Sequence, residues 1–218
     1  VTLESVLAQE NLNAAWSQVK ANDGAAGVDG WDVEQTEALI REHWPRIEAA
    51  LLAGRYQPEA VRAVTIPKAS GGERVLGVPT VLDRWIEQAI HQQLSPVWEP
   101  DFSEHSYGFR PGRSTHQAVR TAQEYVKAGK RWVVDLDLKS FFDRVNHDRL
   151  MHLVGRKVRD KRLLRLLGEY LMAPLQRPDG RRERRTQGTQ QGGPLSPHLA
   201  HIYLDKQEQE MEARGLSF

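Results

Sequence analysis

Trp132-Val-Val-Asp-Leu-Asp-Leu-Lys-Ser-Phe-Phe-Asp143 is a short apolar run that carries two carboxylates to its end. Its alternation of residue types predicts a strand over residues 132–138, followed by a helix. Strand side chains alternate between faces, so Asp135 and Asp137 would point the same way, about 6–7 Å apart. The opposite face would anchor the strand in a core through three apolar residues, Val134, Leu136 and Leu138.

A carboxylate held at the tip of a buried strand suits Mg²⁺ binding in phosphoryl transfer, which makes both Asp135 and Asp137 candidate ligands. The competing interpretation is that Asp137 caps the helix that follows. The run alone does not separate these two readings, and the rest of the chain has to decide between them.

Composition places the chain among globular proteins. Its 218 residues suffice for one large domain or two small ones, and 39% are hydrophobic and 27% charged. Zero cysteines exclude disulfides, thiolate metal sites and a cysteine nucleophile. We find no apolar run near 18 residues and no secretory pattern at the N-terminus, so we expect no membrane span and a cytoplasmic location.

The net charge of +1 hides an uneven distribution of charge along the chain. Residues 1–60 hold 4 Lys and Arg against 10 Asp and Glu, whereas residues 149–185 hold 12 against 4. A concentrated basic segment indicates either a surface that faces a polyanion or a solvated helix face.

Periodicity and turn signals predict an α+β chain without regular strand–helix alternation. We expect a kink or a break at Pro45, and a hairpin within 175–185 that turns at residues 178–180. The predicted helices cover residues 3–19, 33–52, 82–94, 114–128, 147–157, 160–172 and 196–213, and the remaining predicted strands cover 61–67 and 73–76.

A glycine-rich segment, Gln187-Gly-Thr-Gln-Gln-Gly-Gly-Pro-Leu-Ser-Pro197, directly precedes the last predicted helix. Its glycines would let the backbone approach a flat or anionic ligand closely. The spacing matches neither the dinucleotide fingerprint nor a P-loop. By itself the segment is also consistent with an ordinary entry into a helix.

Together these segments resemble the N-terminal part of group II intron-encoded reverse transcriptases, in the family's order and over nearly the whole chain. The resemblance implies a right-hand polymerase fold with fingers and a partial palm. Five segments carry it: Gly24-Ala-Ala-Gly-Val-Asp-Gly30; Val64-Thr-Ile-Pro-Lys68 with Gly72-Glu-Arg-Val-Leu-Gly-Val-Pro-Thr80; Ser106-Tyr-Gly-Phe-Arg-Pro-Gly-Arg-Ser114; Asp137-Leu-Lys-Ser-Phe-Phe-Asp143 with Val145-Asn-His-Asp148; and Gly188-Thr-Gln-Gln-Gly-Gly-Pro-Leu-Ser-Pro197.

The resemblance implies a division into an N-terminal extension (1–30), fingers (31–130), the first catalytic block of the palm (131–158), a basic helix and hairpin (159–187), and a templating loop with its helix (188–218). It implies two-metal nucleotidyl transfer, with an RNA template or intron RNA, a DNA primer and deoxynucleotides as partners.

The resemblance also assigns roles to single residues. Asp137 and the Leu138 carbonyl would bind the Mg²⁺ pair, whereas the family pattern does not make Asp135 a ligand. Phe142 would stack under the incoming sugar and select against a 2′-hydroxyl, or else be a core residue. The incoming nucleotide would contact Lys68 and Arg74 through its triphosphate, and Gln191 and Gly192 near the nascent base pair.

Template contacts would come from aromatic and basic residues of the fingers, Tyr107, Phe109, Arg110 and Arg113. A packed aromatic turn is the alternative for these four residues. His147 and His201 are expected to cap a helix or lie on a helix surface rather than bind metal.

The family's Tyr-x-Asp-Asp motif does not occur before Phe218. We therefore expect these residues alone not to polymerise, since one carboxylate and a carbonyl bind Mg²⁺ weakly. Two alternatives stay open: a non-catalytic RNA-binding module that serves intron splicing, and self-association into a homo-oligomer through apolar palm surface.

Overall fold

The computed structural model describes residues 1–68 and 71–217, and its centre is helix α4 (Val81–Trp98). Thr80 caps this helix by accepting a hydrogen bond from the Asp83 amide (3.1 Å). Three N-terminal helices pack around it: α1 (Leu3–Val6), α2 (Gln9–Asn22) and α3 (Val33–Leu52). Trp85 of α4 joins them, because its indole donates to the Leu12 carbonyl (2.8 Å) and its ring lies 4.8 Å from that of Trp44.

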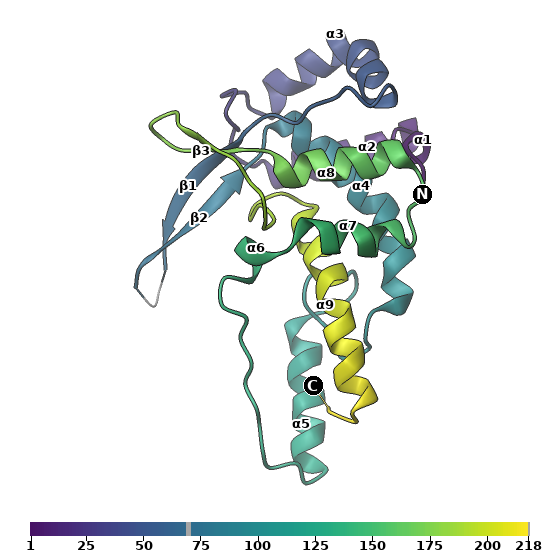
Figure 1. Ribbon diagram of the computed structural model, residues 1–218, viewed down its shortest axis with the longest axis vertical. Coiled ribbons are helices and arrows are strands. Elements are labelled where there is room, and N and C mark those ends of the chain that lie inside the picture. The colour runs from purple at the N-terminus through teal and green to yellow at the C-terminus, as the bar shows by residue number, and fades with distance from the viewer. Residues whose placement is uncertain (69–70, 218) are drawn as a thin grey trace.

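Two hairpins form one four-stranded sheet beside this helical body (Figure 1). β1 (Val61–Pro67) and β2 (Glu73–Val78) are antiparallel, and β3 (Leu175–Gln176) and β4 (Arg182–Glu183) form the second hairpin. β1 pairs with β3 in parallel, which gives the order β2-β1-β3-β4. The sequence predicted both hairpins but not that they join; the turn residues 69 and 70 lie outside the described residues.

The other regular elements in the described part of the chain are helices. α7 (His147–Gly155) contacts both α8 (Lys161–Met172) and α9 (Ser196–Ala213), and Leu150 and Leu163 are fully buried there. The remaining helices are the 3₁₀-helix η1 (Glu99–Asp101), α5 (Thr115–Lys127) and α6 (Phe141–Arg144). Figure 1 shows α5 and the C-terminal half of α9 extending below the main body.

The strand predicted at residues 132–138 is wrong. This segment has no regular secondary structure and runs as an extended connection from α5 to α6 (Figure 1). Its apolar residues do not anchor a core, since Trp132 is 95% and Leu136 71% exposed. A strand is stabilised by pairing with a neighbour, and none of the strands in the described part of the chain reaches this segment.

Two helix predictions need smaller corrections. The first predicted helix is two helices, because the extended backbone of Ala8 (φ −58°, ψ 136°) separates α1 from α2. Conversely, α3 continues through Pro45 as one helix. Pro45 lies on the exposed face, where water can satisfy the Arg41 carbonyl that loses its intrahelical partner.

Candidate active site

The glycine-rich loop, which we define as residues 187–193, lies between the β1–β2 hairpin and α6. The amides of Gly188 and Thr189 donate to the carbonyls of Val145 and Phe142, both at 2.7 Å. On its other side, the Gln191 carbonyl accepts from the Gly77 amide of β2 (2.8 Å). Three segments that are far apart in the sequence therefore meet through backbone hydrogen bonds.

Two glycines make this close approach possible. Gly188 has φ +83°, and a side chain there would place Cβ 2.8 Å from the Phe142 carbonyl oxygen. Gly192 has φ +137°, and its Cβ would overlap the carbonyl oxygen of Gly77. Both positions combine a backbone conformation that disfavours side chains with a lack of space.

The residues predicted to contact the incoming sugar and the nascent base pair come together at this junction. Phe142 and Gln191 are half-buried, and Gly192 is exposed beside β2. The Phe142 ring makes an edge contact with Phe141 (5.5 Å between centroids). His147 binds the Gly188 carbonyl through Nε2 (2.7 Å), so it fixes the loop, a role that the sequence did not indicate.

Lys68 and Arg74 lie at the turn end of the β1–β2 hairpin, and both side chains are exposed. The Lys68 amide closes the turn by donating to the Gly72 carbonyl (2.9 Å). Neither side chain makes an ion pair with another residue that the structure describes. Two cations are thus presented to solvent, as binding of an anionic ligand requires.

Asp137 lies at the end of the extended segment and, like Asp135, is exposed. The Leu138 carbonyl accepts a hydrogen bond from the Phe141 amide (3.2 Å) in the turn that leads into α6. Within residues 1–68 and 71–217, no group of three or more acidic or histidine side chains has the geometry to hold a metal ion. The carboxylate and carbonyl present here do not make a complete Mg²⁺ site.

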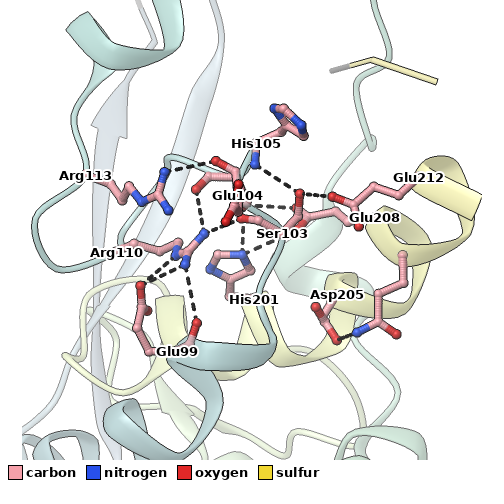
Figure 2. Close-up of polar contacts among 12 residues, drawn as sticks. Glu99, Ser103, Glu104, His105, Arg110, Arg113, His201, Asp205, Glu208 and Glu212 are labelled. Atoms are coloured by element: carbon pink, nitrogen blue, oxygen red, sulfur yellow. Dashed lines mark hydrogen bonds and ion pairs between the residues drawn. The ribbon is translucent and has the colours of Figure 1, made fainter. Parts of the chain in front are cut away.

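Arg110 is buried, in contrast to its predicted contact with the template. Its guanidinium binds Glu99 (2.8 Å) and the carbonyls of Ser103 and Ser106 (Figure 2). All of these partners belong to the segment between α4 and α5. The arginine is therefore occupied in closing this segment on itself and is not available to a nucleic acid in this arrangement.

The other three predicted template residues lie at or near the surface of the same segment. Phe109 is 76% exposed and has φ +54°, an unfavourable conformation for a side chain of this size. The Arg113 guanidinium lies 5.6 Å from the Tyr107 ring centroid, and the Tyr107 hydroxyl bonds to Thr121 (2.8 Å). The segment thus carries one exposed aromatic ring and one pair of an aromatic ring with a cation.

His201 is buried rather than on a helix surface as predicted. Its ring stacks on Phe102 (4.0 Å between centroids), and its Nε2 lies 2.8 Å from the Ser106 hydroxyl. The same nitrogen lies 3.7 Å from Glu208 (Figure 2). Because one nitrogen faces both groups, this is not the relay of a catalytic triad. The cluster instead fastens the Ser103–Arg113 segment to α9.

Two charged residues under the glycine-rich loop were not distinguished by the sequence. Glu87 of α4 is fully buried, and burial followed by the nearby Asp83 raises the pKa of its carboxyl to about 8. Burial also lowers the pKa of Arg185, which precedes the loop. Neither residue belongs to a recognisable motif, and only the fold brings them to the loop.

Internal ion pairs occupy much of the basic segment 149–185. Arg162 binds Glu4 (2.6 Å), and both Arg177 and Arg181 bind Glu183. Arg156 and Arg159 are exposed, without an ion pair to the described residues. The charge available to a polyanion is therefore smaller than the sequence count indicates.

None of the helices in the described parts of the chain is both long and apolar enough to cross a membrane.

Residues 66–217 match the family described as "Reverse transcriptase (RNA-dependent DNA polymerase)". Among curated proteins, the chain is 38% identical over 195 residues to protein YkfC of Escherichia coli, covering 88% of this chain and 51% of that protein. It is 35% identical over 191 residues to the group II intron-encoded protein LtrA of Lactococcus lactis, covering 87% and 31%.

A solved structure described as "Partial Cas6-RT-Cas1--Cas2 complex" shares the fold, with a TM-score of 0.63 and 23% identity. The match covers 97% of this chain and 35% of that one. The 218 residues thus span about half or less of the length of these relatives.

Proposed function

Because the chain belongs to the reverse transcriptase (RNA-dependent DNA polymerase) family, we propose that it forms the fingers and part of the palm of an RNA-directed DNA polymerase encoded by a group II intron. The junction around the glycine-rich loop supports this proposal best. It brings Phe142 and Gln191 to one place, next to β2 of the hairpin that carries Lys68 and Arg74.

The residues of the hairpin and of the junction each bind a different part of a deoxynucleotide. Lys68 and Arg74 bind its triphosphate through charge-assisted hydrogen bonds. Gln191 and Gly192 form the floor under the nascent base pair, where the lack of a side chain on Gly192 leaves room. Phe142 contacts the sugar and disfavours a 2′-hydroxyl.

Template RNA passes over the exposed part of the segment between α4 and α5. Phe109 offers a base a stacking surface, and Arg113 contacts the backbone beside Tyr107. The buried Arg110 supports this surface from below without touching the strand.

Magnesium binding requires more carboxylates than Asp137, because the described residues hold no complete ligand set. We propose Asp137 and the Leu138 carbonyl as part of the metal site of the intact enzyme. Bound Mg²⁺ would neutralise charge on the transferred phosphate. What Asp137 contributes by itself is an exposed carboxylate directly before the turn at Leu138–Phe141 that leads into α6.

Primer extension with the gene's full-length product tests this proposal. Asp137→Ala should lower the rate by about 10²-fold or more, since even partners that only orient metal ligands are worth 10–100-fold. Asp135→Ala is the matched control, two residues away and equally exposed, and should change the rate by less than about threefold. Equal losses in the two variants would refute the role of Asp137.

The 218 residues alone should give no extension with Mg²⁺ and deoxynucleotides. Product that disappears on Asp137→Ala would contradict this expectation. The gene sequence beyond codon 218 gives a second test, because a Tyr-x-Asp-Asp motif shortly after it supports the polymerase.

A non-catalytic RNA-binding function for splicing is the second candidate, favoured by Phe109 and Arg113, which need no metal to bind RNA. Binding of a single-stranded RNA should then survive Asp137→Ala and weaken with salt. The double substitution Arg156→Gln and Arg159→Gln should make log affinity fall less steeply with log salt, reducing the absolute slope by about 1.4 if both arginines contact phosphates. Arg181→Gln, which removes an ion-paired arginine, is the control.

A further inference from the structure

The underside of the glycine-rich loop rests on a single acidic side chain of α4. The Glu87 Oε1 accepts a hydrogen bond from the Gln190 side-chain amide. A side chain at Gly193 would overlap the Glu87 Oε2. One carboxyl group therefore contacts two positions of the loop, Gln190 and Gly193.

This carboxyl group lies where an ionised oxygen is poorly stabilised. Glu87 is fully buried, and neither its Oε2 nor the Gln190 Oε1 has a hydrogen-bond partner. The titratable and charged groups facing it are Asp83 and Arg84 of α4, Tyr170 of α8, and Arg185. No cation forms an ion pair with it within the part of the chain that the structure describes.

We propose that Glu87 is a positioning residue: its carboxyl group packs under the glycine-rich loop and fixes the position of Gln190 and Gly193 relative to α4. This inference rests on the proposed function, in which the neighbouring Gln191 and Gly192 form the floor of the nascent base pair. The support works in the uncharged state, since burial and Asp83 raise the Glu87 pKa to about 8.

The protonation state gives the support a defined pH dependence. In the closed loop the group stays protonated up to about pH 8, whereas in an opened, solvated loop it ionises near its ordinary value of 4.5. Opening therefore releases a proton across this window and becomes easier as the pH rises. The protection of the loop amides against hydrogen exchange should fall roughly tenfold per pH unit, and the decrease should level off above about pH 8.

Amide hydrogen exchange of residues 188–193 from pH 5 to pH 9 tests this proposal, after division by intrinsic exchange rates. The wild-type chain should lose protection with the slope given above, whereas Glu87→Gln, neutral at every pH, should show a flat profile. At pH 8 the variant should exceed the wild type by at least tenfold. Glu10→Gln, an exposed glutamate of α2, is the control and should follow the wild type. Parallel profiles for wild type and Glu87→Gln would overturn the proposal.

A double-mutant cycle provides a test that does not depend on ionisation. Gly193→Ala should destabilise the loop by overlap with the Glu87 carboxyl, and Glu87→Ala removes that carboxyl. Loop exchange in the double variant should therefore be at least fivefold slower than the two single effects combined predict. Additive effects would show that the loop does not rest on Glu87.

Both measurements use the chain without nucleic acid or nucleotide. If primer extension fails while they succeed, Glu87 supports the loop and the polymerase assignment is at fault. With the full-length polymerase, extension by the wild type should decline from pH 7 to pH 9 relative to Glu87→Gln. Identical pH profiles for the two enzymes would place the support outside catalysis and overturn its role in nucleotidyl transfer.

Discussion

The glycine-rich loop and the carboxylate segment (residues 130–138) carry the two motifs that identify the site, yet the structure holds them very differently. The loop bonds through its backbone to Phe142, Val145 and Gly77, and its Thr189 is buried. The carboxylate segment is exposed throughout and pairs with no strand in the described part of the chain. A motif is thus positioned by the groups around it, and its own residues do not suffice.

The first prediction compares two leucines within residues 131–158, one in each kind of surroundings. Leu150 of α7 is fully buried, whereas Leu136 of the carboxylate segment is 71% exposed. Leu150→Ala should lower the free energy of unfolding by about 3–5 kcal/mol, and Leu136→Ala by less than about 0.5 kcal/mol. Denaturant unfolding measures both. A large cost at Leu136 would show that the carboxylate segment is packed in solution and would remove the contrast.

The same contrast explains which predictions from sequence succeeded. The helix from Ser196 to Ala213 was predicted at both ends, because Ser196-Pro197 and Gly215 are local signals. The strand at 132–138 failed because an alternating pattern specifies a strand only where a neighbour pairs with it.

Predictions for the site residues also succeeded only in part, because some depend on how distant segments fold together. The resemblance identified the junction residues Phe142, Gln191 and Gly192, which the fold brings together. It could not show that Arg110 and His201 are buried, since burial depends on α9 and on the Ser103–Ser106 turn folding against each other. Glu87 escaped notice because a glutamate in an amphipathic helix looks like a surface residue until the loop covers it.

The second prediction concerns the close approach that holds the loop. In denaturant unfolding, Gly192→Ala should lower the free energy of unfolding by about 2–4 kcal/mol. The added Cβ combines backbone strain at φ +137° with overlap at the Gly77 carbonyl. Gly180→Ala is the control for strain alone, since its φ is +84° and its Cβ would have open space. Equal costs would show that strain, not contact with β2, sets the conformation of the loop.

The third prediction uses pH to loosen the helix that follows the loop. His198 of α9 is buried against Trp98 and Phe102, and burial followed by His91 and His201 lowers its pKa to about 3. The unfolded chain takes up a proton below its ordinary value of 6.5, whereas the folded chain does not. This contribution to stability is therefore complete above pH 6.5 and falls by about 1.4 kcal/mol per pH unit towards pH 3.

Unfolding curves between pH 4 and pH 7 measure this dependence. His198→Phe should reduce the slope by one proton, because it keeps an aromatic ring and loses the titrating group. His116→Phe on the exposed face of α5 should leave the slope unchanged. An unchanged slope in His198→Phe would mean that His198 is not buried in its neutral form.

The last and smallest effect concerns what the exposed carboxylate segment does in the absence of a pairing strand. Apolar side chains from Trp132 to Leu138 line a cavity of about 1330 Å³ together with Tyr203 and Met211 of α9. Exposed apolar surface of this kind favours self-association. Light scattering of the 218-residue chain at several concentrations should show association, and Leu136→Ala should weaken it by about fivefold, or about 1 kcal/mol. Val119→Ala, on α5 outside the cavity, should leave it unchanged.

If the same Leu136→Ala variant changes neither stability nor association, the segment is solvated on all sides. Its carboxylates would then owe their position only to the turn before α6, and the contrast with the glycine-rich loop would be complete.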